Sequence, residues 1–301
     1  MRQLIWIIVI LAAFAAASQA DAPLAAADSQ PTFGPSIAAA PTDQPPDRPA
    51  TDPAETQPAT DEATSAPTKP APTDPAVIEI LNKLEAAGPK HRTIRSDVEM
   101  HITDRLTGDS ELRTGWLSYR KADEKTPAGF RVHFDTLKLG ESPAIKDEVD
   151  YAFDGHFFTV AKHKIKDMQR YQVAAEDEQA EPMKLGKGPF PLPFGQKTAD
   201  VLERFEATTR EVKPSEPAGT VFLQLQPRRE HYETSDFVKL EMWVDPQTYL
   251  PVKLTSRDKN KKTTTITFKD LKTNVDVDEK MFHMPQPAGW TYRVERLEQP
   301  E

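Results

Sequence analysis

The chain has 301 residues, 28 of them proline and none cysteine, and a formal net charge of −9. Without cysteine it has neither disulfides nor a lipid attached through a cleavage-site cysteine, so an exported form must be held by its own core. About nine acidic and two basic residues fall within residues 21–76, which leaves the remainder nearly neutral. No basic patch of the kind that binds nucleic acid is visible, and no nucleic-acid partner is expected.

Residues 1–20 have the pattern of a secretory signal peptide. Arg2 precedes an apolar run over residues 4–17, and the small residues Ser18 and Ala20 occupy the −3 and −1 positions of a cleavage site. The run is shorter than the roughly 20 residues of a membrane-spanning helix. The sequence therefore predicts export to the periplasm with cleavage between Ala20 and Asp21. The alternative is an uncleaved segment that tethers the chain to the inner membrane, facing the periplasm.

Residues 21–76 are predicted to be a disordered linker. Roughly a quarter of them are proline, and most of the rest are alanine, threonine, serine and acidic residues. Such a segment buries too little apolar surface to offset the entropy of ordering it, and its prolines favour extended conformations. We expect residues 77–301 to form one domain.

A helix is predicted where this domain begins. Asp74 is placed as its N-cap and Pro75 as its first residue. Ile78, Leu81 and Leu84 recur at helical spacing and predict an apolar face that packs on the domain.

The rest of the domain is mainly β. In residues 96–104, Val98, Met100 and Ile102 alternate with polar residues, and Asp154-Gly155 joins two aromatic-rich arms as a hairpin turn. Connections are short, which favours an antiparallel meander. Further predicted strands lie within residues 129–135, 149–160, 164–173, 220–226, 237–245, 250–258, 263–271 and 291–298.

Residues 174–206 interrupt the alternation. Prolines surround Phe190, Leu192 and Phe194 and prevent regular strand pairing, and Thr198 can cap a short helix with an apolar side. A long insert of this composition in a β domain is predicted to act as a lid or a plug.

Motifs that carry catalysis are absent from the sequence. It contains no HExxH, GxSxG, GxGxxG or Walker-type sequence. His101 and His133 occupy polar positions of their strands, and His156 and His163 are also predicted to lie at the surface. No buried pair of carboxylates is expected. We therefore predict no catalytic residue, no metal site and no cofactor, and a protein that is not an enzyme.

The order of these parts resembles the LolA-like family of periplasmic lipoprotein-sorting proteins. The resemblance spans about residues 77–297 and rests mainly on the C-terminal half, where a W-V-D element, an L-P pair, an F–N strand end and an F-x-x-P-x-G element follow one another. The matching residues are Trp243, Val244 and Asp245, then Leu250 and Pro251, then Phe268 and Asn274, and finally Phe282, Pro285 or Pro287, and Gly289.

The resemblance implies a mainly β (α+β) fold, a half-open antiparallel β-barrel whose concave apolar face holds acyl chains under a helical lid formed by residues 183–205. Arg120 or Lys121 would be the basic residue that gates this lid, although the proline that usually follows is missing. The residues expected to contact lipid are Met100, Trp116, Val132, Phe134, Phe153, Leu185, Phe190, Leu192, Phe194, Val201, Leu202, Leu240, Met242, Leu254, Ile266 and Phe268.

Two functions follow as hypotheses. In the first, the exported domain binds lipid acyl chains or lipoproteins and takes part in lipoprotein sorting or transport. In the second, the same fold has a closed core and serves as a sensor or interaction module that binds a protein partner in the cell envelope.

The lid assignment makes a testable prediction. The double substitution Phe190→Asp and Phe194→Asp places two charges where acyl chains are expected, so uptake of a fluorescent fatty acid should be lost while the fold stays intact. Fatty-acid titration followed by circular dichroism measures both. Unchanged uptake would remove residues 183–205 from the binding site.

Overall fold

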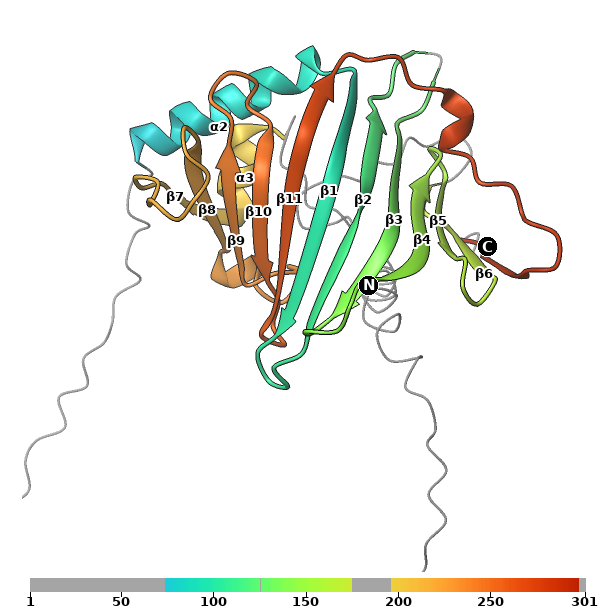
Figure 1. Cartoon of the computed structure of the whole chain (residues 1–301). Coiled ribbons are helices and arrows are strands. Elements are labelled where there is room, and N and C mark those ends of the chain that lie inside the picture. Colours follow the sequence, from blue (N-terminus) through green and yellow to red (C-terminus); the bar gives the residue numbers. More distant parts are fainter. Residues whose placement is uncertain (1–73, 125, 175–195, 298–301) are drawn as a thin grey trace, which may run out of the picture. The chain divides into compact units, whose positions relative to one another are not determined.

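The computed structural model describes residues 74–124, 126–174 and 196–297. Their strands form one open, curved sheet in the order β12-β6-β5-β4-β3-β2-β1-β11-β10-β9-β8-β7 (Figure 1). The strands are β1 (Thr93–Asp104), β2 (Ser110–Arg120), β3 (Gly129–Leu139), β4 (Ile145–Phe153), β5 (Phe157–Lys162), β6 (Asp167–Gln172), β7 (Phe205–Thr208), β8 (Val221–Pro227), β9 (Lys239–Val244), β10 (Pro251–Arg257), β11 (Lys262–Thr273) and β12 (Thr291–Glu295). The helices are α2 (Pro75–Ala87) and α3 (Thr198–Arg204), with 3₁₀ turns η1 (Gly88–Lys90), η2 (Arg229–His231) and η3 (Glu279–Met281).

Helix α2 begins as predicted, and its buried stripe differs by one residue from the expected one. The Asp74 side chain accepts a hydrogen bond from the Ala76 backbone N–H at 2.9 Å. Val77, Leu81 and Leu84 are buried, whereas Ile78 is 37% exposed. Spacings of four and three residues keep Val77 in line with the other two, and Ile78 lies about 100° further round the helix.

The pairing of strands departs from a simple meander at two places. The strands from β1 to β6 form one antiparallel meander and the strands from β7 to β11 form another, and β1 pairs with β11 to join them. The last strand, β12, returns to pair with β6 in parallel. The prediction of an antiparallel sheet therefore holds for every pair except this one. A parallel pair requires a long connection between its strands, and here residues 173–290, which include β7–β11, separate β6 from β12.

One face of the sheet is mainly apolar, because the strand register aligns the alternating apolar residues. Met100 lies opposite Ile266, which lies opposite Leu254, then Met242, then Leu223, across five strands. All five side chains are buried. Each such side chain contributes about 1.5–3 kcal/mol when removed from water.

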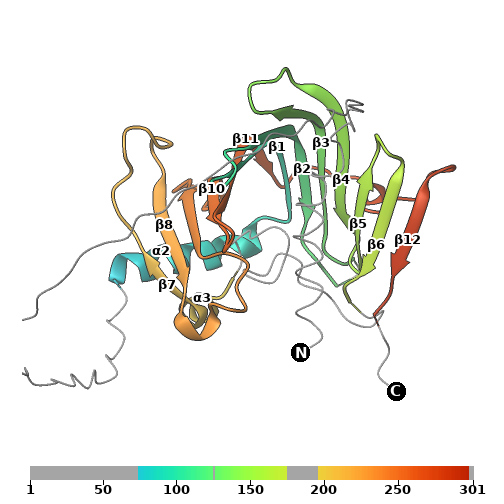
Figure 2. The ribbon, with the colours of Figure 1, turned by 90° about the horizontal axis from the view of Figure 1, so that it is seen from below.

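The apolar face is the concave side of the curved sheet. Helices α2 and α3 lie across this side, over the half that contains β7–β11 (Figures 1 and 2). Among the described residues, no helix lies over the half that contains β3–β6. We call this side the concave face and the opposite side the outer face.

Strand β2 contains a glycine that the neighbouring backbone requires. The pairing of β2 with β3 shifts register between Thr114 and Gly115. A Cβ atom at Gly115 would lie 1.8 Å from the His133 carbonyl oxygen and 2.7 Å from the Phe134 Cα. Backbone atoms cannot move aside without breaking the ladder, so any side chain here must separate the strands.

We expect Gly115→Ala to lower the free energy of unfolding by about 3 kcal/mol, measured by urea denaturation. Gly108→Ala is the matched control. Gly108 has a φ of +81° but no atom within 4 Å of the added Cβ, so only backbone strain of about 1 kcal/mol is expected there. Equal losses at the two positions would contradict the close approach at Gly115.

Candidate functional site

The concave face over β3–β5 is lined by aromatic rings in mutual contact. Phe130 stacks on Phe153 with ring centroids 5.9 Å apart and contacts Phe158 at 6.1 Å. Tyr151 meets Phe134 edge-on at 6.2 Å and stacks on Phe158 at 6.4 Å. Rings at these spacings form a continuous apolar floor, in which each ring is at most 1% exposed.

Most of the described residues predicted to contact lipid belong to the buried cluster of this face. Leu202 packs against the cluster and is partly buried. Leu185, Phe190, Leu192 and Phe194 lie outside the described residues, so their role stays a prediction. The residues that the structure brings together in the cluster are Met100, Val132, Phe134, Phe153, Val201, Leu240, Met242, Leu254, Ile266 and Phe268.

Trp116 is placed on the opposite side of the sheet from these residues. It lies opposite His133 of β3 and Asp97 of β1 on the outer face, and its neighbour Leu117 faces the concave side. Polar residues occur on both faces of β2, so its sequence does not indicate which face Trp116 takes. The expectation that Trp116 lines the concave face is therefore corrected.

A buried group of charges lies among the apolar residues of the concave face. The Arg113 guanidinium is 2.5 Å from a carboxylate oxygen of Glu111 and 2.8 Å from one of Asp147. Burial opposes the charge of Arg113, but the two carboxylates keep its pKa above the usual value. Glu111 and Asp147 are therefore two carboxylates buried together, and the expectation that no such pair exists is wrong. The signal available in the sequence was the opposite charges of Glu111 and Arg113, two residues apart in one strand.

The outer face contains a second buried network, centred on Asp150. Its carboxylate accepts hydrogen bonds from Arg131 Nε at 2.8 Å, His133 Nδ1 at 2.9 Å and His163 Nε2 at 2.7 Å. Asp150 is completely buried. Burial raises its pKa, but the bonds from His133 and Arg131 outweigh burial and hold the pKa well below the usual range. The bond to Asp150 raises the pKa of His133.

This network corrects two expectations from the sequence. His133 and His163 were predicted to be surface residues, and they are instead tied to a buried carboxylate. His133 was assigned correctly to the polar side of its strand, but that side is covered here, and His163 follows β5 on the same side. The C-terminal segment lies over it: Trp290 meets the His163 ring edge-on at 5.0 Å, and Arg131 donates to the Met281 carbonyl oxygen at 3.2 Å.

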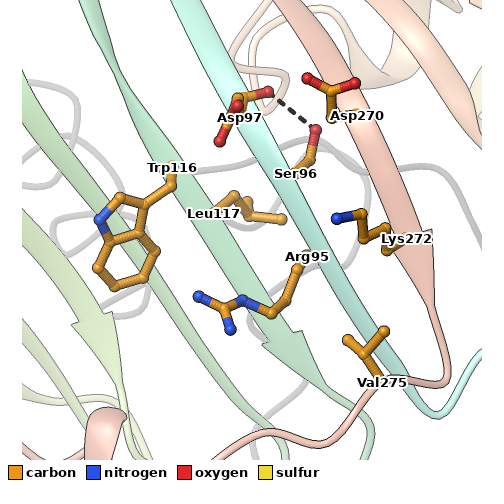
Figure 3. A pocket seen from close by; sticks show the side chains of 8 residues that line it. All are labelled: Arg95, Ser96, Asp97, Trp116, Leu117, Asp270, Lys272 and Val275. Atoms are coloured by element: carbon orange, nitrogen blue, oxygen red, sulfur yellow. Dashed lines mark hydrogen bonds between the residues drawn. The ribbon is translucent and has the colours of Figure 1, made fainter.

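A pocket of about 420 Å³ lies beside this network, where β1, β2 and β11 meet (Figure 3). Trp116 forms one wall, with its ring stacked on His133 at 5.5 Å. The residues that line it are Arg95, Ser96, Asp97, Trp116, Leu117, Asp270, Lys272 and Val275.

Arg120, the predicted gating residue, contacts the C-terminal segment. Its guanidinium is 2.9 Å from a Glu279 carboxylate oxygen and lies over the Phe282 ring, 5.1 Å from the centroid. Lys121 is exposed, and its backbone N–H donates to the Arg92 carbonyl oxygen. Most of the predicted lid lies outside the described residues, so gating by either residue stays a prediction.

Within residues 74–124, 126–174 and 196–297, no group of three histidine, aspartate or glutamate side chains is arranged to hold a metal ion. In the same ranges, neither the length nor the hydropathy of any helix suffices to cross a membrane.

No family model matches the sequence, and no curated protein matches it. Several solved structures are similar in three dimensions. A LolA superfamily protein from Nitrosomonas europaea is 11% identical, with 69% of this chain and 97% of that chain covered and a TM-score of 0.31. An outer membrane lipoprotein-sorting protein domain from Vibrio parahaemolyticus is 15% identical, with 69% and 96% covered and a TM-score of 0.33. A MucA/MucB complex from Pseudomonas aeruginosa contains a chain 17% identical, with 70% and 61% covered and a TM-score of 0.35.

The family that the sequence resembles thus recurs among the structures that this chain is similar to.

The Asp150 network predicts how stability depends on pH. A carboxyl with a lowered pKa stabilises the fold above its unfolded pKa of about 3.9 and loses this contribution as pH falls. A histidine with a raised pKa stabilises below its unfolded pKa of about 6.5 and loses this contribution as pH rises through its folded pKa. The network should therefore stabilise most between about pH 4 and pH 6.5.

We expect His133→Gln to lower the free energy of unfolding more at pH 6 than at pH 9, measured by urea denaturation at both values. His101→Gln, at an exposed position of β1, is the matched control and should have the same small effect at both. If the loss at His133 were independent of pH, its protonated form would not be what Asp150 binds.

Proposed function

We propose that this chain binds the acyl chains of lipids or lipoproteins on its concave face and catalyses no reaction. One observation carries the proposal: a single apolar face extends over an open sheet, and its aromatic half over β3–β5 has no helix above it among the described residues. A closed domain of this size would be expected to cover such a face with regular structure of its own.

The energetics of the face suit a hydrocarbon ligand. Transfer of one methylene group from water to an apolar surface contributes about 0.8 kcal/mol, so roughly ten methylenes supply about 8 kcal/mol before the cost of ordering the chain. Phe130, Tyr151 and Phe158 supply a ring surface for these contacts. Arg113, Glu111 and Asp147 add polar atoms on the same face that can form hydrogen bonds with the ester or amide end of an acylated ligand.

The setting of this activity is proposed to be the cell envelope. The signal sequence predicts a periplasmic protein released at Ala20-Asp21, and the acidic, proline-rich residues 21–76 would separate the domain from any anchor that is retained. A lipoprotein-sorting or transport role would follow from binding of acyl chains at this location.

A second candidate is favoured by a specific observation. Phe130, Tyr151 and Phe153 are each at most 1% exposed, as in a closed core. In that case the concave face holds the domain together, and the function is the binding of a protein partner in the envelope.

Native mass spectrometry of the exported full chain separates the two candidates. A co-purifying phospholipid or acylated peptide, released by organic extraction, would support lipid binding. A protein that carries no such mass and takes up no fluorescent fatty acid would exclude lipid binding and leave the closed core.

For lipid binding, we expect Val132→Trp to weaken fatty-acid affinity about tenfold, a difference of about 1.4 kcal/mol, because the indole would occupy space above the floor between Leu117 and Tyr151. Overpacking costs about 1–3 kcal/mol of stability, so urea denaturation must accompany the titration. Val294→Trp, at an exposed position of β12, should bind like the native chain. Equal affinities for both variants would place acyl chains elsewhere.

A further inference from the structure

The pocket on the outer face is built around an irregularity in the sheet. The pairing of β1 with β11 shifts register between Arg95 and Asp97, so β11 has one residue more than β1 in this interval. Asp270, within the extra length, has a φ of +49°. The Ser96 hydroxyl donates to the Lys269 carbonyl oxygen at 2.8 Å, which satisfies an acceptor at the bulge. Bulges of this kind redirect side chains and are frequent beside binding sites.

Two cationic residues line one part of the pocket. Arg95 and Lys272 lie directly opposite each other in the β1–β11 pair, and both side chains line the pocket. Like charges directly opposite destabilise a pair of strands. Among the described residues, neither cation forms an ion pair. An anion bound between them would convert this repulsion into two favourable contacts.

Two carboxylates lie at the other end. Figure 3 shows Asp97 and Asp270 grouped together, away from Arg95 and Lys272. Asp97 is two residues from Arg95 along β1, a separation of about 6.5 Å in an extended strand. Neither carboxylate forms an ion pair within the described ranges. The pocket thus has two cationic side chains at one end and two carboxylates at the other.

Trp116 forms a wall of the pocket that the Asp150 network holds in place. Its ring stacks on His133 with an interplanar angle of 29°, and the Arg131 guanidinium lies 5.6 Å from its centroid. His133 and Arg131 are both bound to the buried Asp150. A wall fixed in this way does not have to be ordered when a ligand binds, which reduces the entropic cost of binding.

We propose that this pocket binds a small zwitterion, with its anionic group between Arg95 and Lys272, its ammonium group at Asp97 and Asp270, and its carbon atoms against Trp116. Phosphoethanolamine, either free or as the headgroup of phosphatidylethanolamine, belongs to this class. The site is separate from the concave face and does not depend on the binding of acyl chains there.

The test follows the tryptophan indole N–H signals of the full chain by NMR during titration with phosphoethanolamine. The chain has four tryptophans, and Trp116→Phe identifies the signal of Trp116. We expect a saturable shift of that signal, and a smaller response to inorganic phosphate or to ethanolamine alone. Trp243 is the internal control, because it is also on the outer face with Lys253 4.9 Å from its ring centroid but does not line the pocket.

Charge variants distinguish the pocket from general attraction to the sheet. Arg95→Gln or Lys272→Gln should each raise the dissociation constant about tenfold, because each removes one charge-assisted contact. Both side chains are exposed, so the fold should tolerate either change. Arg257→Gln, which removes an arginine from β10 outside the pocket, should leave the dissociation constant unchanged.

The source of the ligand is decided by a vesicle experiment. Flotation with phosphatidylcholine vesicles that contain or lack phosphatidylethanolamine should show recruitment by the headgroup, lost in Lys272→Gln, if the pocket takes the lipid form. Response in the NMR titration alone assigns the pocket to the free zwitterion. The proposal is overturned if neither arm responds, if phosphate alone shifts the Trp116 signal as strongly, or if the Arg95 and Lys272 variants bind like the native chain.

Discussion

The pairing of β1 with β11 is the interaction on which the rest of the structure depends. It brings together segments about 170 residues apart in the chain and converts two separate meanders into one sheet. Closing so long a loop costs entropy that grows only slowly with its length, and the contacts of Met100 and Val98 with Ile266 and Phe268 offset it. The same pairing places both parts of the concave face side by side and contains the bulge that forms the outer pocket.

Because side chains alternate along each strand, the concave face carries mainly apolar residues and the outer face carries the charged network. Val132 and Tyr151 face the concave side, and their sequence neighbours His133 and Asp150 face outward. A slip of one residue between β3 and β4 would exchange these faces, burying charges among phenylalanine rings and exposing the rings to water. The charged network therefore helps to specify the register that the apolar face requires.

The C-terminal segment explains how a polar network comes to be buried on the outer face. Strand β12 pairs with β6, and Met284 packs with Ala152, Ala161 and Met168 in a small second cluster. Because the side chains of Ala152 and Ala161 are small, the C-terminal segment can pack closely against the outer face of the sheet. Beneath it, Asp150 loses its water and is compensated by three donors, which is the condition for a buried charge to be tolerated.

The sequence by itself determined the mainly β class, the helix that begins at Pro75 and the alternating apolar residues that became the concave face, because these depend on local periodicity and capping. Tertiary structure alone decided that Trp116 lies outward, that β12 runs parallel to β6, and that His133 and His163 meet on one buried carboxylate. It also decided that Arg95 and Lys272 lie opposite each other. Each of these depends on the register between strands distant in the chain, and a strand's own sequence does not specify which neighbour it pairs with or where a bulge falls.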